Sequence, residues 1–283
     1  MSRLEIVSWN IQAGRGGDGC VDLDRIANTV REFGEPDIIC FQEVARHMPG
    51  VTGGADVDQA AELSARYSDF EAVFRPSVDL GQRQFGCMIF SRFPVLQIRN
   101  HLLPRPSVGE PRSMQRQALE ATIDVPGGPL RVTTTHLEFN SSRHQDVQVN
   151  RLREIHRDAS RRAKGKNVEL TAGQSPYYEP PSAEMAVACG DFNFVPESNM
   201  HEHFVAEFTD GASALVDAWE ARYAGTPHPD TCGISDRNQW PQGPHCRDFF
   251  FVTDLLAQRI STVDVNQHTE ASDHQPIRIV FEE

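Results

Sequence analysis

Residues 185–193 read MAVACGDFN, an apolar run that leads without a break into Gly190, Asp191, Phe192 and Asn193. A short apolar run of this kind predicts a buried β-strand over residues 185–189. An aspartate and an asparagine follow directly where that strand ends. Taken alone, such residues could form an ordinary turn by bonding to the backbone. If other strands end in the same way, their polar side chains gather at one edge of a sheet and form a site.

Several other predicted strands have polar residues at one end. Asn10 follows a strand at 4–9, Glu43 follows one at 37–41, and His136 follows one at 130–135. Near the C-terminus, Asp248 opens a strand in CRDFFF (246–251), and the SDH sequence at 272–274 directly precedes the last strand. Each signal is weak by itself. Their joint occurrence over nearly the whole chain predicts one catalytic domain spanning residues 1–283.

The order of the predicted elements indicates an α+β fold. A strand, a helix whose apolar face includes Leu23, Ile26 and Val30, and a second strand come first, and this unit favours a parallel strand pair. A succession of β-like segments follows, with Gly127 and Gly128 as a hairpin turn, and favours antiparallel pairing. We therefore expect mixed sheets. Further helices are predicted around residues 152–163 and over residues 214–222.

Composition limits the class of protein. An apolar fraction of 39% and 16 phenylalanines support a sizeable core in a chain of 283 residues. The start, MSRLEIVSWN, lacks the basic and then apolar pattern of a secretion signal, and no apolar stretch reaches the roughly 18 residues of a membrane span. The formal net charge of -13 disfavours a broad nucleic-acid surface. We expect a cytoplasmic monomer with no membrane span.

The cysteines are scattered rather than paired, and several lie within apolar strands, which is typical of reduced core residues. One cluster of residues offers soft ligands for zinc, namely His228, Cys232, His245 and Cys246. It lacks the paired spacing of a zinc finger or knuckle. We therefore favour an ordinary loop over a zinc site on those four residues.

The polar strand ends suit a hard cation and phosphoester chemistry. Mg²⁺ prefers carboxylate and amide oxygens with water, and Glu43, Asn10 and Asp273 offer such oxygens. Hydrolysis of a phosphoester further requires a positioned water and stabilisation of the phosphoryl charge. His274, next to Asp273, offers an imidazole for this chemistry.

At these positions the chain resembles the endonuclease/exonuclease/phosphatase superfamily of metal-dependent phosphoesterases. The resemblance runs from residue 8 to residue 276 and covers these motifs: SWN, FQEV, FGCMIFSRFPV, QRQALEA, TTTHLE, GDFN, CRDFFF and SDHQP. It implies a four-layer α/β/β/α sandwich of two mixed β-sheets, as in DNase I, with the site at one end of the sandwich. It also implies a divalent metal, Mg²⁺ or Mn²⁺.

The resemblance further implies a role for each site residue. Glu43 would be the main metal ligand, assisted by Asn10 and Asp273. Asp191 would position or activate the attacking water, Asn193 would hold a phosphoryl oxygen, and His136 would stabilise the pentacovalent phosphorus. His274, oriented by Asp248, would act as base or electrostatic clamp, and the sequence leaves open whether Asp191 or His274 takes the proton. Arg116, in QRQALEA, would have either a structural role, which we favour, or a phosphate-facing one.

Two departures from the family pattern reduce the case for cleavage at abasic DNA sites. Gln12 stands where the abasic-site endonucleases carry an acidic residue, and no tyrosine occurs between Leu103 and Gln117. We therefore predict a phosphodiesterase or phosphatase that uses in-line attack of water on phosphorus, with a phosphate ester as substrate. A DNA or RNA nuclease is the alternative, supported by a basic helix around Arg151–Arg162. A noncatalytic binding module is a third. The aperiodic segment 168–182 is a candidate wall of the substrate cleft.

Overall fold

The computed structural model describes residues 3–106, 113–164, 178, 180–236 and 239–282. Most of the segment 168–182, the candidate wall of the cleft, lies outside these residues. Within the described part of the chain, no helix is long and apolar enough to cross a membrane.

The first sheet joins the two ends of the chain. Its strands, in spatial order, are β11 (Ile260–Val265), β12 (Ile277–Phe281), β1 (Leu4–Asn10), β2 (Ile38–Arg46), β4 (Arg83–Ser91) and β3 (Glu71–Leu80). The pair β1–β2 is parallel and the other pairs are antiparallel. The sheet is therefore mixed, as the strand–helix–strand pattern near the N-terminus predicts.

The second sheet is built from the middle of the chain. Its strands, in spatial order, are β5 (Val95–Leu102), β6 (Gln117–Val125), β7 (Gly128–His136), β8 (Met185–Asp191), β10 (Asp248–Thr253) and β9 (Leu215–Asp217). Here β7–β8 is the parallel pair. The two sheets thus have the same plan, with one parallel pair and antiparallel neighbours.

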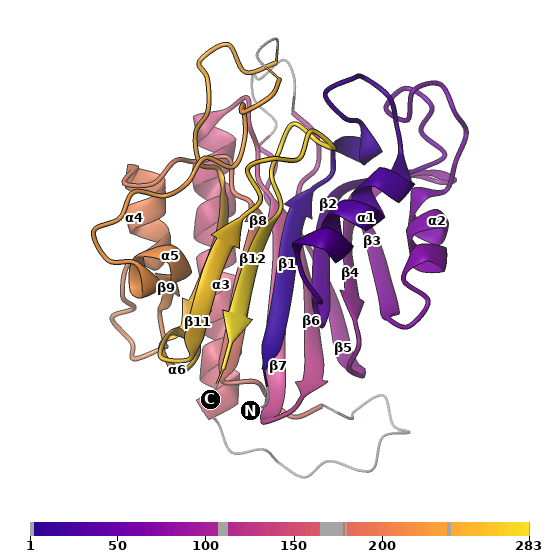
Figure 1. Ribbon diagram of the computed structural model, residues 1–283. Coiled ribbons are helices and arrows are strands. Elements are labelled where there is room, and N and C mark those ends of the chain that lie inside the picture. Colours follow the sequence, from indigo (N-terminus) through magenta and orange to yellow (C-terminus); the bar gives the residue numbers. More distant parts are fainter. Residues whose placement is uncertain (1–2, 107–112, 165–177, 179, 237–238, 283) are drawn as a thin grey trace.

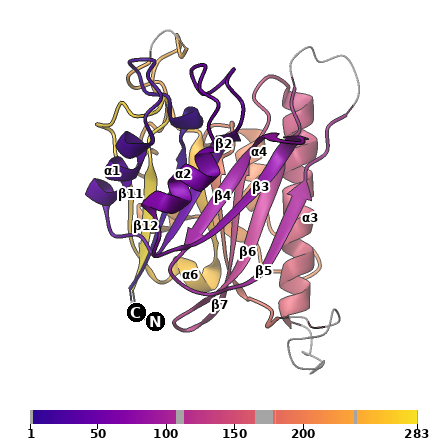
Figure 2. The ribbon, with the colours of Figure 1, turned by 90° about the vertical axis from the view of Figure 1, so that its right-hand side faces the viewer.

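Helices cover the outer faces of both sheets (Figures 1 and 2). The helices α1 (Leu23–Phe33) and α2 (Gln59–Arg66) pack on the first sheet, and α3 (Ser142–Lys164) and α4 (Asn199–Val205) pack on the second. Short elements lie in the connections: η1 (Gln12–Gly14), α5 (Ala218–Arg222) and α6 (Asp254–Ala257). The predicted four-layer α/β/β/α sandwich is confirmed.

Alternation along the strands explains the layers. In β1, Leu4 and Ile6 belong to the core between the sheets, whereas Val7 and Trp9 pack into the core under α1 and α2. Successive side chains of a strand point to opposite faces, so a strand that is apolar at nearly every position must be covered on both sides. All seven residues of β1 are buried.

The helix predicted over residues 214–222 is wrong in its first part. Residues 215–217 form the edge strand β9, and α5 begins only at Ala218. The cause is Asp217, whose side chain accepts hydrogen bonds from the backbone N–H groups of Trp219 and Glu220. An aspartate in this N-cap position starts a helix rather than continuing one.

The parallel pairs direct the site to one end of the molecule. Strands β1, β2, β7 and β8 end at the upper edge in Figure 1, whereas both chain termini lie at the lower edge. The polar residues at or near the ends of these strands therefore meet at the upper edge.

Candidate active site

Strand register places the predicted site residues next to one another. His136, the last residue of β7, is the register partner of Asp191 at the end of β8. Asp248, which opens β10, pairs with Asp191 from the other side. Asn10 is the last residue of β1 in the facing sheet, whereas Glu43 lies within β2, which continues past the predicted strand end to Arg46.

Local backbone geometry directs the side chains of Glu43 and Asp191 toward the site. Glu43 has a φ of 61° and lies at an irregularity in the pairing of β2 with β4, between Phe41 and Val44. A bulge of this kind re-aims a side chain out of the regular strand alternation. Gly190 has a φ of +128°, and a Cβ there would lie 2.1 Å from the carbonyl oxygen of Thr135. Only glycine therefore allows β8 to approach β7 closely just before Asp191.

Asn10 links the carboxylates of the two sheets. Its Nδ2 donates to Glu43 Oε1 at 3.0 Å and to Asp191 Oδ2 at 3.1 Å. Its Oδ1 accepts from the backbone N–H of Gln12 at 3.1 Å. In this orientation Asn10 presents its amide nitrogen to the site, and it would have to turn its amide over to offer oxygen to a cation.

Glu43 and Asp273 form the acidic part of the site. Burial and then the negative charge of Asp273 raise the pKa of Glu43 to about 7. Asp273 is fixed in place because its Oδ2 accepts from Gln239 Nε2 at 2.7 Å and from Trp240 Nε1 at 3.1 Å. A carboxyl group whose ionisation is disfavoured by a neighbouring carboxylate fits a divalent cation, which would remove the repulsion and supply the hard partner that carboxylate oxygens prefer.

His274 lies between two aspartates. Its Nδ1 is 2.8 Å from Asp248 Oδ2, and its Nε2 is 3.5 Å from Asp191 Oδ2. Burial alone would lower the pKa of His274, but the negative charges of Asp248, Asp191 and Asp273 raise it well above its ordinary value. Asp248 is itself held by the hydroxyl of Thr231, which donates at 2.6 Å. The ring therefore has a fixed orientation with Nε2 facing Asp191.

His136 approaches the same carboxylate from the other side. Its Nε2 lies 3.4 Å from Asp191 Oδ2, and its Nδ1 lies 3.6 Å from Glu43 Oε1. Burial, together with the positive charges of Arg116 and His274, lowers the pKa of His136 well below its ordinary value. A neutral imidazole in this position can donate one hydrogen bond to a substrate oxygen.

Asn193 and Arg247 form the neighbouring wall. Asn193 has a φ of 54°, and its Nδ2 donates to the carbonyl oxygen of Leu137 at 3.0 Å. Arg247 Nη1 donates to Asn193 Oδ1 at 3.1 Å, and its guanidinium lies over the rings of Phe139 and Trp240. The sequence interpretation missed Arg247, although it directly precedes Asp248 in the CRDFFF motif. The signal that could have found Arg247 was its position directly before the aspartate that opens a strand.

Arg116 is buried beside the site. It shares the lining of a small cavity with Glu43 and His136. Its Nε lies 3.7 Å from Glu138 Oε2, and its Nε and Nη1 make no hydrogen bond within the described residues. These N–H groups are buried next to the carboxylates, and the positive charge of Arg116 acts on both Glu43 and His136.

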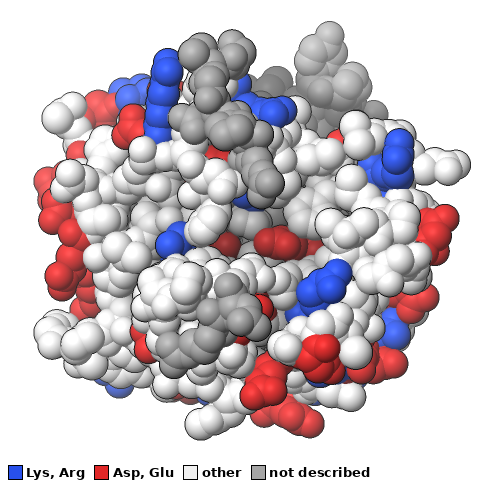
Figure 3. All heavy atoms as spheres, turned by 90° about the horizontal axis from the view of Figure 1, so that it is seen from above, with Lys and Arg blue, Asp and Glu red and all other residues white. Residues whose placement is uncertain are grey.

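The structure thus brings together the residues that the sequence proposed for the site. Figure 3 looks onto this end of the molecule: Asp and Glu side chains lie in a central hollow with Lys or Arg side chains beside it.

The motif SWN also holds the SDH loop. Trp9 Nε1 donates to the carbonyl oxygen of His274 at 2.9 Å, and Ser272 Oγ donates to that of Asn10 at 2.8 Å.

The sequence pattern of the Endonuclease/Exonuclease/phosphatase family matches residues 7–274. The chain belongs to this family. Its members are hydrolytic phosphoesterases, so the coarse chemistry expected from the sequence agrees with the family. No curated protein sequence matches the chain.

Solved structures of family proteins show the same fold. An endonuclease/exonuclease/phosphatase from Beutenbergia cavernae is 24% identical with a TM-score of 0.70, and the alignment covers 100% of this chain and 72% of that one. One from Bacteroides vulgatus is 17% identical with a TM-score of 0.71, covering 100% and 99%. A mannosyl-6-phosphatase from Bacteroides thetaiotaomicron is 18% identical with a TM-score of 0.68, covering 98% of each chain. At these identities the likeness concerns the fold.

Proposed function

We propose that residues 1–283 form a single catalytic domain that hydrolyses a phosphate ester with Mg²⁺ or Mn²⁺, by in-line attack of water and without a covalent enzyme intermediate. One observation carries this proposal. A single oxygen, Asp191 Oδ2, lies 3.4 Å from His136 Nε2, 3.5 Å from His274 Nε2 and 3.1 Å from Asn10 Nδ2. A carboxylate oxygen with hydrogen-bond donors on several sides can position a water molecule and accept the proton that the water loses.

Each residue around that oxygen has a proposed role. Asp191 and His274 act as one pair that orients the attacking water and receives its proton, and Asp248 keeps the imidazole aimed at Asp191. His136 donates a hydrogen bond to a phosphoryl oxygen. The second amide hydrogen of Asn193 does the same, because only one donor of Nδ2 is used by Leu137. These contacts stabilise charge that develops on the phosphoryl group.

Glu43 and Asp273 would hold the metal ion, with Asn10 as a third ligand if its amide turns over. Their donor oxygens, and the pKa of Glu43 raised to about 7 beside Asp273, support a cation in this position. When bound, Mg²⁺ or Mn²⁺ would neutralise charge on the phosphoryl oxygens.

We propose a small phosphate ester as substrate rather than a long nucleic acid. The basic helix was the sequence support for a nuclease, and several of its arginines pair with other groups of the protein. Arg151 pairs with Glu154, Arg161 pairs with Asp210, and Arg153 donates to the carbonyl oxygen of Phe204. The cytoplasmic location and monomeric state stay predictions.

A hydrolysis panel tests this function. We expect release of phosphate or alcohol from at least one of bis-nitrophenyl phosphate, nitrophenyl phosphate, sugar phosphates and mononucleotides with Mg²⁺ or Mn²⁺. A chelator should abolish the reaction, and Glu43→Ala should be inactive. Inactivity toward all esters, or full activity of Glu43→Ala, would overturn the proposal. Faster cleavage of single- or double-stranded DNA than of small esters would favour the nuclease.

A further inference from the structure

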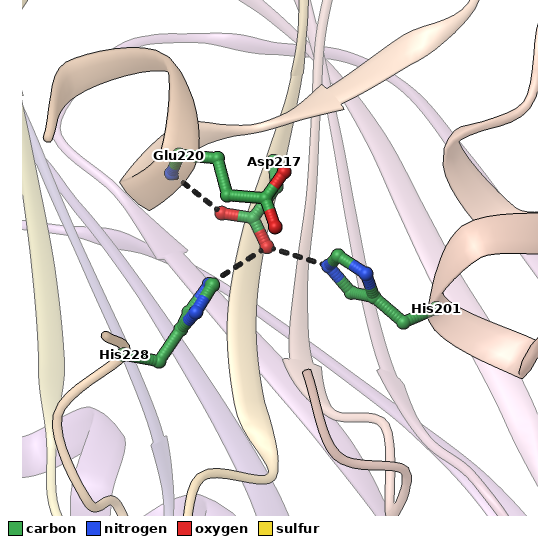
Figure 4. A group of neighbouring side chains, drawn as sticks. All are labelled: His201, Asp217, Glu220 and His228. Carbon is green, nitrogen blue, oxygen red and sulfur yellow. Dashed lines mark hydrogen bonds and ion pairs between the residues drawn. The ribbon is translucent and has the colours of Figure 1, made fainter. Parts of the chain in front are cut away.

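A second cluster of metal-binding side chains lies away from the phosphoester site. His201 comes from α4, Asp217 from the end of β9, Glu220 from α5 and His228 from the loop that follows (Figure 4). One ligand atom of each residue lies within 4.8 Å of those of the other three. We propose that these four residues form a binding site for a transition-metal ion, zinc in particular.

The two imidazoles converge on one oxygen. Asp217 Oδ2 is 2.8 Å from His201 Nε2 and 3.0 Å from His228 Nε2. In a tetrahedral zinc site with bonds of about 2.0–2.1 Å, the ligand atoms lie roughly 3.4 Å apart. The rings therefore need to move outward from the carboxylate by only about half an ångström to admit an ion, with the imidazole proton carried on Nδ1.

Asp217 is fixed in the orientation that such a site requires. Its Oδ1 accepts from the backbone N–H groups of Trp219 at 2.8 Å and Glu220 at 3.2 Å, which leaves Oδ2 directed between the two rings. A ligand that is already oriented loses little entropy on binding.

The imidazoles are likewise held by their surroundings. The His201 and His228 ring centroids lie 5.5 Å and 5.6 Å from that of Phe249. The His201 side chain is 3% exposed and that of His228 is 9% exposed. Rigid imidazoles in an apolar surrounding suit zinc, for which nitrogen and carboxylate oxygen are common ligands.

Glu220 completes the donor set from the solvent side. It is exposed, and its side chain reaches from α5 toward the Asp217 carboxylate (Figure 4). Within the described part of the chain, neither Asp217 nor Glu220 forms an ion pair with a lysine or arginine. Two neighbouring carboxylates without such a partner favour a divalent cation, and the exposed Glu220 leaves that cation a route from solvent.

This site shares only His228 with the four zinc ligands that were considered from the sequence. Cys232 Sγ lies 3.4 Å from His245 Nε2, whereas His228 faces Asp217. The loop between α5 and β10 nevertheless connects the two sites, because it carries both His228 and Thr231, whose hydroxyl holds Asp248. An ion at this place would fasten that loop to α4 and α5.

Cobalt binding tests the proposal. The chelator-treated protein is titrated with Co²⁺ or Zn²⁺ while excess Mg²⁺ occupies the phosphoester site. We expect one equivalent of Co²⁺ to give the intense visible absorption of tetrahedral cobalt, Zn²⁺ to displace it, and Zn²⁺ to raise the melting temperature. His228→Gln and Glu220→Gln should each weaken binding at least about tenfold, because even the loss of an outer-shell partner costs that much.

Matched variants separate this site from other sources of binding. His203→Gln alters an exposed histidine of the same helix and should leave Co²⁺ affinity unchanged, as should Glu43→Gln in the phosphoester site. Since Glu220 is exposed, Glu220→Gln tests the site even if His228→Gln does not fold. Absence of binding, equal affinity in His228→Gln, Glu220→Gln and the wild type, or loss of the cobalt spectrum only in Glu43→Gln would overturn the proposal. The cluster would then be a hydrogen-bonded His–Asp–His group.

Discussion

Replacing Asp248 by asparagine tests how His274 is oriented. Asp248 is buried, and its Oδ2 accepts from His274 Nδ1 at 2.8 Å and from the hydroxyl of Thr231 at 2.6 Å. Asparagine keeps the size of the side chain and removes its charge. The imidazole then faces either a neutral carbonyl oxygen or an NH₂ group that cannot accept its proton.

The expected loss follows from the change in this one hydrogen bond. A hydrogen bond to a charged group contributes about 1.5–3 kcal/mol, and a neutral one contributes about 0.5–1.5 kcal/mol. The difference of about 1–2 kcal/mol in the transition state lowers kcat by about 5- to 30-fold. If the NH₂ group faces His274, the loss is larger. KM should change little, because Asp248 contacts His274 rather than the substrate.

The measurement is kcat and KM on the best ester of the hydrolysis panel, at saturating Mg²⁺, with the fold checked by circular dichroism. Asp264→Asn is the matched control. Asp264 lies on β11, and its partly exposed carboxylate pairs with Arg278 Nη2 at 2.8 Å. Removing this charge should keep kcat within about twofold of the wild type. A folded Asp248→Asn protein whose kcat stays within twofold of the wild type would refute the role of Asp248 as the residue that orients His274.

Three further substitutions test other parts of the structure. Glu43→Gln should weaken Mg²⁺ affinity at least about tenfold by calorimetry, and unchanged affinity would place the ion elsewhere. Arg116→Gln distinguishes the two roles considered for Arg116. A phosphate-facing arginine supplies about 1.5–3 kcal/mol of charged hydrogen bonding, so that role predicts a fall in kcat/KM of about 10- to 150-fold with a small change in melting temperature. The structural role predicts a large fall in melting temperature with normal kinetics. Burial would raise the pKa of Glu120, but His101, Arg131 and Arg99 lower it to about 2. The stability that this carboxylate contributes, of order 3 kcal/mol, is therefore present above its unfolded pKa of about 4.3 and lost as pH falls toward 2. In urea unfolding, the free energy of unfolding of the wild type should exceed that of Glu120→Gln at pH 7, and most of this difference should be lost by pH 2. A difference in stability that does not depend on pH would contradict this.

The elements were predictable where a local pattern fixes them. The strands that became β1, β2, β7 and β8 are apolar or β-branched segments, and each carries an oxygen- or nitrogen-bearing side chain at or near its end. The predicted boundaries were wrong where a single side chain fixes the start of a helix. The helix predicted from residue 214 starts at Ala218, because Asp217 caps it, and nothing in the apolar spacing records that cap.

The site residues were predictable as types, and their partners were not. Trp240 holds Asp273, and Arg247 holds Asn193, although each comes from a loop with no periodic signal. Asn10 was expected to offer an oxygen and instead donates hydrogen bonds to Glu43 and Asp191. Such contacts depend on which strand ends lie side by side.

The sequence by itself therefore determined the alternation of apolar and polar positions, and with it the mixed sheets and the polar strand ends. Alternation is a property of neighbouring residues, and it can be read from the chain. Only the tertiary structure decided that Asp191 lies between His136 and His274, and that His201 and His228 meet at Asp217. These positions are set by strand register, by the packing of the two sheets and by helix caps, which join residues far apart in the chain.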